Sequence, residues 1–348
     1  MKHTMAIIGF GGMGSHHYHK LIKEQEICCV GVWDIKAERR EYAESLGLHA
    51  YTSLEDLLAD ERVEIVLIAT PNDCHHPIAI QALEAGKHVL CEKPVTLNAQ
   101  LLAEMQAAAD KAGKLFTVHQ NRRWDRDFFL VQHFLKEGIL GEVYRIESRV
   151  HGAHGIPGDW RQDPKQGGGM VYDWGVHMLD QVVALFPDAK IKTVFATLTN
   201  VTNTDTDDGF IIHLQLDNGI HFVVEVGTSH FITLPRWMVL GRDGTLMLDN
   251  WGLEGKIVCA HGEDDKDVVP VVTSAGLTKT MAPRREDTIK TVEIPDIWPN
   301  YDEYYRNLVA CLEGRESPHV TAPQMQRVMR LIETVFESAR VGQVLSFE

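Results

Sequence analysis

The sequence predicts an α/β protein: an N-terminal Rossmann domain with a doubly wound parallel sheet, then a C-terminal α+β domain built on a large, mainly antiparallel, open-faced sheet. Three observations lead to this prediction. Apolar runs first alternate with helical stretches, a glycine-rich loop follows the first run, and later runs alternate residue by residue. At roughly 100–200 residues per domain, the 348 residues form two domains, which we place at 1–121 and 122–348.

Strand and helix alternate in the N-terminal domain. Runs that are apolar throughout are expected in a parallel sheet whose two faces are covered by helices. Asn98 and Gly113 are typical of the first and last caps of a helix and bound one helix closely. The predicted strands are 5–8, 27–33, 64–69, 88–91 and 115–119, and the predicted helices run from the glycine loop to about Lys23 and over 37–46, 53–59, 76–85 and 98–112.

The C-terminal domain shows a two-residue period. Phe210, Ile212, Leu214 and Leu216 alternate with other residues, and Asp217-Asn218-Gly219 indicates a hairpin turn after them. Such alternation gives a sheet with one covered face and one face open to solvent or to another subunit. The predicted strands are 142–150, 192–202, 210–216, 220–226, 238–240 and 245–248, and the predicted helices are 170–186, 301–312 and 324–341.

The open face of the strands in 210–226 predicts an assembly. A large exposed apolar face usually marks an interface, so we expect a homo-oligomer, either a dimer or a tetramer. The polar segment 255–296 has no predicted structure.

Composition excludes several classes of protein. Lys and Arg number 34 against 49 Asp and Glu, a net charge of −15, which disfavours nucleic acid and anionic membrane surfaces as partners. No apolar run approaches the roughly 20 residues that span a bilayer, and Met1–Ile8 does not resemble a secretory leader. Six cysteines lack disulfide or metal spacing, so we expect a reducing, cytoplasmic location.

Histidine groups are numerous, but none predicts a metal. Their spacing to Cys or carboxylate residues matches no recognised ligand set, so we expect no metal site. The groups are His16, His17 and His19, then His75 and His76, then His151 and His154.

The loop Gly9-Phe10-Gly11-Gly12-Met13-Gly14 predicts a dinucleotide site. It fits G-x-G-x-x-G, follows a predicted strand and opens a predicted helix, and Asp34 ends the next strand twenty positions after Gly14. Asp34 should bond the adenosine ribose and repel a 2′-phosphate, so NAD is favoured over NADP. Arg39 and Arg40 weaken that preference. The alternative is a glycine-rich turn with no ligand.

Two further segments carry candidate chemistry. Lys93, before Pro94, ends a predicted strand where ligands bind in open α/β sheets, although it could be a surface lysine before a turn. Asp173 and His177 are spaced i and i+4 on a predicted helix, with Asp180 three positions further on. The alternative is a buried core histidine with Asp173 as its partner. Gly167, Gly168 and Gly169 precede this helix and remove side chains where a ligand could approach.

Together Gly9–Gly14, Glu92-Lys93-Pro94 and Gly167–Asp180 resemble the Gfo/Idh/MocA oxidoreductase family, which includes inositol dehydrogenases, glucose–fructose oxidoreductase and many sugar dehydrogenases. The resemblance covers essentially the whole chain in order and spacing, and Asn121-Arg122-Arg123 resembles the family's crossover between domains. Segment 255–296 matches nothing that informs on substrate. Besides the glycine loop and Asp34, the resemblance implies cofactor contacts from Thr70, Pro71, Asn72, His75, Glu92, Lys93, Gln120, Trp160 and Arg161.

The resemblance implies reversible oxidation of a secondary alcohol by hydride transfer to nicotinamide. His177 is the candidate base, because an unperturbed imidazole titrates close to neutral pH. Asp173 would orient His177 or contact substrate hydroxyls, and Lys93 would stabilise developing alkoxide charge. The implied substrate-binding residues are Lys93, Asn121, Arg122, Asp173 and His177.

Three functions compete at this point. The first is an NAD-dependent dehydrogenase of a sugar, a sugar derivative or a cyclitol. The second is a glycosidase that holds NAD and cleaves glycosides by transient oxidation, without net redox change. The third is a non-catalytic sensor that uses NAD only as a ligand, against which the set Lys93, Asp173 and His177 argues.

Overall fold

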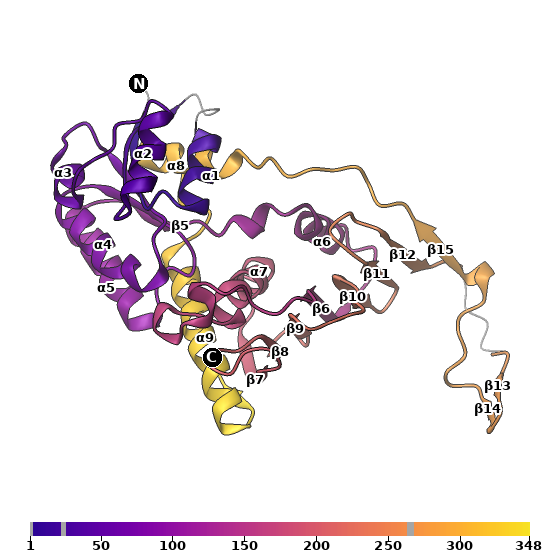
Figure 1. Ribbon diagram of the computed structural model, residues 1–348. Coiled ribbons are helices and arrows are strands. Elements are labelled where there is room, and N and C mark those ends of the chain that lie inside the picture. Colours follow the sequence, from indigo (N-terminus) through magenta and orange to yellow (C-terminus); the bar gives the residue numbers. More distant parts are fainter. Residues whose placement is uncertain (1–2, 22–25, 263–267) are drawn as a thin grey trace.

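The computed structural model describes residues 3–21, 26–262 and 268–348. Figure 1 shows the N-terminal part of the chain gathered around one sheet and the later part around a second sheet. The predicted fold class is confirmed. Within the described ranges, no helix is long and apolar enough to cross a membrane.

The N-terminal sheet is parallel and has the order β2-β1-β3-β4-β5. All the strand residues of β3 are buried, as expected for a central strand covered on both faces. Asn98 caps α5 through its side chain, and Gly113 ends that helix in the left-handed region, as predicted. The strands are β1 (His3–Ile8), β2 (Ile27–Trp33), β3 (Ile65–Ile68), β4 (His88–Cys91) and β5 (Phe116–Val118). The helices are α1 (Gly12–Leu21), α2 (Ala37–Ser45), α3 (Leu54–Ala59), α4 (Asn72–Glu84) and α5 (Ala99–Ala112).

One N-terminal helix begins four residues before its predicted start. Helix α4 begins at Asn72, not at residue 76, because the chain turns into the helix directly after Pro71. The predicted end of the first helix near Lys23 falls outside the described residues.

The second sheet joins nine strands in the described ranges, in the order β15-β12-β11-β10-β6-β9-β8-β7-β16. Neighbours are antiparallel except β6 and β9, which pair in parallel. The strands are β6 (Val143–His151), β7 (Ile191–Thr199), β8 (Gly209–Leu216), β9 (His221–Gly227), β10 (Trp237–Gly241), β11 (Gly244–Leu248), β12 (Gly255–Ala260), β15 (Ile289–Val292) and β16 (Leu345–Ser346). The α-helices of this part are α6 (Arg126–Glu137), α7 (Val176–Leu185), α8 (Glu303–Leu312) and α9 (Ala322–Val341).

The predicted helix over 170–186 is wrong in its first turn. A π-helix, η4 (Val171–Gly175), precedes α7, and π segments of this kind are often found at functional sites. Helix α6 was not predicted, although Phe128, Val131 and Phe134 recur at helical spacing and are buried.

The two faces of the second sheet differ in chemistry. Phe210, Ile212 and Leu214 of β8 are buried in the core, while Ile211 and His213 lie on the other face and are more exposed. The alternation is therefore confirmed, but the expected large apolar face is wrong. That face carries ion pairs, in which Arg149 contacts Glu147 and Glu225.

Segment 255–296 supplies the last two strands at one side of the large sheet and a separate hairpin. β12 and β15 extend the large sheet. Between them, β13 (Val271–Thr273) and β14 (Gly276–Thr278) pair with each other and, within the described residues, with no other strand. Residues 268–285, here called the hairpin arm, stand away from the rest of the molecule (Figure 1).

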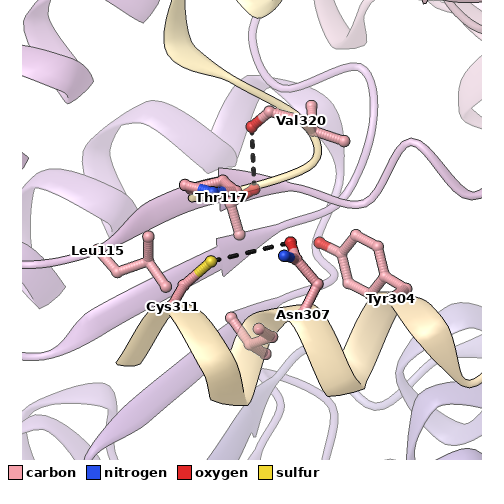
Figure 2. A pocket seen from close by; sticks show the side chains of 8 residues that line it. Leu115, Thr117, Tyr304, Asn307, Cys311 and Val320 are labelled. Carbon is pink, nitrogen blue, oxygen red and sulfur yellow. Dashed lines mark hydrogen bonds between the residues drawn. The ribbon is translucent and has the colours of Figure 1, made fainter. Parts of the chain in front are cut away.

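Helix α8 returns to the N-terminal sheet. Figure 2 shows Tyr304, Asn307 and Cys311 of α8 beside Leu115 and Thr117, around a small cavity of about 10 Å³. Tyr305 and Leu308 join the same apolar cluster as Met5 and Ile7 of β1. The division at residue 121 stays a prediction, and α8 is a C-terminal element that packs on the N-terminal core.

Candidate active site

A cleft of about 720 Å³ follows the carboxyl ends of the Rossmann strands and reaches the start of α7. Parallel strands bring their ends to one edge of the sheet, so residues far apart in sequence meet there. The predicted site residues that line it are Gly9, Gly11, Gly12, Met13, Asp34, Thr70, Pro71, Asn72, Glu92, Lys93, Asn121, Arg122, Trp160, Arg161, Asp173 and His177.

The glycine loop has two structural glycines and two that face open space. Gly9 has φ +88°, and a Cβ there would lie 2.6 Å from the carbonyl oxygen of Ala69. A Cβ on Gly14 would lie 2.0 Å from the carbonyl oxygen of Gly9, so this position permits close helix–strand packing. A Cβ on Gly11 or Gly12 would meet none of the described atoms within 4 Å. The open space lies at the N-terminus of α1, which fits a bound pyrophosphate.

Asp34 lies at the end of β2 and is tied to the glycine loop. Its Oδ2 accepts a hydrogen bond from the backbone N–H of Phe10 at 2.7 Å, and its Oδ1 accepts one from Lys36 at 2.9 Å. Arg39 also lines the cleft, while Arg40 donates to the carbonyl oxygens of Asp34 and Ile35. One arginine and one carboxylate therefore lie where an adenosine ribose would bind.

Lys93 and Asp173 form an ion pair across the two domains. The Lys93 Nζ donates to the Asp173 backbone oxygen at 3.0 Å and to its Oδ1 at 3.2 Å. Arg161 Nε donates to Asp173 Oδ2 at 2.8 Å. Burial favours a raised pKa for Asp173, but Lys93 and Arg161 outweigh burial and lower the pKa. Asp173 is therefore a charged anchor between two cations.

His177 is buried and is not paired with Asp173. Among the described residues its Nδ1 has no hydrogen-bond partner, which corrects the expectation that Asp173 orients the ring. The pairing fails because Asp173 lies in the π-helix, where Lys93 and Arg161 occupy its carboxylate. Burial lowers the pKa of His177 well below its usual value, and Lys93 and Arg122 lower it further. His177 is therefore neutral near pH 7. Asp180, three residues on, pairs with Arg123 at 2.7 Å.

Glu92 sits at the centre of a buried cluster that sequence spacing did not reveal. Its Oε1 is hydrogen-bonded to His17 Nε2 at 2.7 Å and to His119 Nδ1 at 2.8 Å, and its Oε2 accepts the Lys93 N–H. Tyr305 of α8 bonds His17. Burial favours a raised pKa for Glu92, but His119 and His17 outweigh it and hold the pKa well below its usual range. A buried negative charge thus fixes the backbone that carries Lys93.

The family descriptions cover both halves of the chain. "Oxidoreductase family, NAD-binding Rossmann fold" matches residues 3–120, and "GFO/IDH/MocA C-terminal domain" matches residues 128–247. The chain belongs to the Gfo/Idh/MocA oxidoreductase family. It is an NAD(P)-binding oxidoreductase, and the resemblance noted from the motifs is confirmed.

Relatives of this Gfo/Idh/MocA protein align over nearly its whole length. The scyllo-inositol 2-dehydrogenase (NADP(+)) IolW of Bacillus subtilis is 28% identical over 99% of this chain and 96% of its own. The uncharacterized oxidoreductase YdgJ of Escherichia coli is 30% identical over 97% of this chain and 96% of its own. The crystal structure of an NAD-binding protein from Listeria innocua is 44% identical, covers 99% of both chains and superposes with a TM-score of 0.96.

Some predicted residues lie beside the cleft without lining it. Phe10 is buried against Tyr18 and Tyr42, so only its backbone N–H serves the site. His75 is buried and bonds the carbonyl oxygens of Thr70 and Pro94, which fixes the turn after β3. Gln120 is also buried, and its Oε1 has no hydrogen-bond partner among the described residues.

The three glycines before η4 serve the chain's own packing. A Cβ on Gly168 would lie 2.4 Å from the carbonyl oxygen of Arg161, and one on Gly169 would lie 2.2 Å from Asp207. Their predicted role in ligand approach is wrong, since these three positions do not line the cleft. Instead Gly168 lets the chain pass close to the backbone of Arg161, whose side chain reaches Asp173.

Several cleft residues were missed because they carry no motif. Trp174 is the most informative, because its ring lies 6.0 Å from that of His177 and Arg122 lies 4.8 Å above it. The sequence could have indicated Trp174, because it is an aromatic residue between the two candidate site residues Asp173 and His177. The others are Trp33, Ile35, Lys36, Ala69, Cys74 and Ile78.

Proposed function

We propose that this protein is an NAD-dependent dehydrogenase that oxidises a secondary alcohol of a sugar, a sugar derivative or a cyclitol. One observation carries the proposal: a lysine ammonium and a neutral, desolvated histidine lie in the same cleft as a glycine loop with open space at its helix N-terminus. The relative IolW, whose name specifies scyllo-inositol, supports a polyol as substrate.

The chain's own residues divide the work of this reaction. A bound nicotinamide supplies the hydride acceptor. His177 accepts the hydroxyl proton, since it lines the cleft and its ring is neutral near pH 7. Lys93, held in place by Asp173, stabilises the negative charge that develops on the reacting oxygen.

Polar groups near Lys93 and His177 would bind the polyol. Arg122 stacks on Trp174 and pairs with Asp125, which holds its guanidinium near His177. Asn121 lines the cleft next to it. Several fixed donors and acceptors suit a substrate with many hydroxyls. A ligand without those hydroxyls would leave the buried polar groups of the site unpaired and would therefore bind less well.

We propose NAD rather than NADP as the cofactor. Asp34 directly follows β2, and its buried carboxylate accepts hydrogen bonds from two backbone N–H groups. At this place the carboxylate would bond the ribose and repel a 2′-phosphate. IolW is named for NADP(+), so members of this family differ in cofactor. Fluorescence titration with both cofactors tests the preference. Asp34→Ala should reduce the difference between the affinities for NAD and NADP. Tighter binding of NADP than of NAD by the unmodified protein would contradict the proposal.

The activity itself is tested by following NADH absorbance with NAD and a panel of sugars, inositols and glycosides. Steady NADH formation with at least one free polyol is the expected result. Aglycone release without NADH accumulation would instead identify the transient-oxidation glycosidase. NAD binding with neither reaction would identify the sensor.

A further inference from the structure

Glu92 is a buried carboxylate in the cleft that the proposed reaction does not use. It directly follows β4, precedes Lys93 and lines the cleft, and the residue is 4% exposed. A carboxylate in such a place loses its hydration, so it stays charged only where hydrogen-bond donors or cations compensate that loss. Which of the two compensates Glu92 decides whether its charge is available to a ligand.

The partners of Glu92 are hydrogen-bond donors. His17 Nε2 and His119 Nδ1 bond its Oε1, and the Lys93 backbone N–H bonds its Oε2 at 3.1 Å. Burial lowers the pKa of His17, and His119 lowers it further, so the His17 ring is neutral near pH 7 and donates from Nε2. Within the described ranges, the ion pairs of Glu92 involve these two histidines and no Lys or Arg.

The cations at the end of the cleft that holds Lys93 and His177, here called the catalytic end, each have a carboxylate partner. These ion pairs are Lys93–Asp173, Arg161–Asp173, Arg161–Asp159 and Arg122–Asp125. They join three cations to three carboxylates, so with neutral histidines Glu92 adds one negative charge in excess. This charge acts on the cleft: burial, Lys93 and Arg122 lower the pKa of His177, and Glu92 opposes them.

Strand order indicates which part of a dinucleotide lies toward Glu92. Asp34, after β2, marks the adenosine end, and the glycine loop after β1 fits the pyrophosphate. In the order β2-β1-β3-β4-β5, strand β4 lies two places beyond β1, on the side away from β2. A cofactor that follows this edge of the sheet therefore directs its nicotinamide end toward Glu92 and the catalytic end.

The two redox states of the cofactor differ in charge at that end. The oxidised nicotinamide ring is positively charged, and the reduced ring is neutral because it has accepted a hydride. The adenosine and pyrophosphate are the same in both forms. A fixed negative charge near the ring therefore stabilises the oxidised form when bound and acts little on the reduced form. Since Glu92 is buried, salt screens this attraction less than it screens a surface ion pair.

We propose that the Glu92 carboxylate is the counter-charge of the oxidised nicotinamide ring and shifts the selectivity of the cleft toward NAD⁺ over NADH. His17 and His119 are positioning residues, since they hold the charged carboxylate at the wall of the cleft. The inference depends on dinucleotide binding and not on the polyol, so it can fail while the proposed reaction stands, and the reverse.

Equilibrium titrations with NAD⁺ and NADH, followed by tryptophan fluorescence, test the proposal without substrate. They are made at pH 8.5, well above the ordinary pKa of an imidazole, so that a protonated histidine does not neutralise the carboxylate. Glu92→Gln should weaken NAD⁺ binding on the order of tenfold and change NADH binding by less than about twofold. Asp34→Asn makes the same carboxylate-to-amide change at the adenosine end. As the matched control, it should weaken both forms alike and leave their ratio unchanged.

Two further variants separate the charge of Glu92 from its packing. Glu92→Met is a second neutral variant that folds if a buried amide is not tolerated, because an apolar side chain of similar size often replaces a buried charge well. It should change the ratio of NAD⁺ to NADH affinity as Glu92→Gln does, and thermal melts identify the folded variants. Glu92→Asp keeps the charge and should keep the ratio close to that of the unmodified protein. Equal losses of NAD⁺ and NADH affinity in the neutral variants, an unchanged NAD⁺ affinity, or as large a change of ratio in Glu92→Asp would each overturn the proposal.

Discussion

The two ends of the cleft are built on different physical grounds. At the cofactor end, backbone geometry decides the structure: Gly9 and Gly14 are fixed by contacts of 2.6 Å and 2.0 Å that a Cβ would make. At the catalytic end, side-chain electrostatics decide it, since Asp173 is shared by Lys93 and Arg161, and the His177 Nδ1 has no hydrogen-bond partner among the described residues. A local motif specifies backbone geometry well, but it does not specify which charges meet.

The largest expected effect removes the proton acceptor. His177→Ala should reduce turnover by about 10²–10⁴, because no other neutral base adjoins Lys93 among the described residues that line the cleft. Lys93→Ala should be comparably damaging through lost stabilisation of the alkoxide. Steady-state kinetics with NADH detection measure both variants. His76→Ala, on α4 and bonded to Glu104, is the control and should keep full activity.

NAD affinity separates chemistry from binding in these variants. His177→Ala should bind NAD nearly as tightly as the unmodified protein. Near-full activity of either variant on the true substrate would remove that residue from the mechanism.

A matched pair of glycine variants tests the cofactor end. Gly14→Ala should lower the free energy of unfolding by about 3 kcal/mol or more, because its Cβ overlaps the Gly9 carbonyl oxygen. Gly12→Ala should leave stability nearly unchanged, since its Cβ meets no described atom within 4 Å, yet weaken NAD binding. Thermal melts and NAD titrations measure the two effects. Equal melting temperatures for the two variants would contradict this division of roles.

A smaller effect tests the corrected role of Asp173. Asp173→Asn removes the carboxylate that anchors Lys93 and should lower kcat/KM by about tenfold, the effect of roughly 1.4 kcal/mol. The acidic limb of the pH profile should stay in place, because Asp173 makes no hydrogen bond to His177 in the described structure. A limb that moves to lower pH in Asp173→Asn would restore the Asp173–His177 pair.

From the sequence, the fold and the residues that belong to the site can be predicted more fully than the contacts between those residues. The strand–loop–helix pattern around Gly9–Gly14 predicts β1 and α1 because glycine requirements are local. The π-helix at Val171–Gly175 was not predictable, since hydrophobic spacing does not distinguish it from an α-helix. Nor was the bond between His17 and Glu92, because only the fold brings these distant segments together.

The acidic limb of kcat/KM for alcohol oxidation tests the central claim most directly. Only neutral His177 accepts the proton, and burial with Lys93 and Arg122 lowers its pKa, so activity should persist below pH 6.5 and fall only as the pH drops through that lowered value. The account predicts that this limb disappears in His177→Ala and survives in Lys93→Ala. A limb that survives His177→Ala and disappears with Lys93→Ala would contradict it and make Lys93 the base.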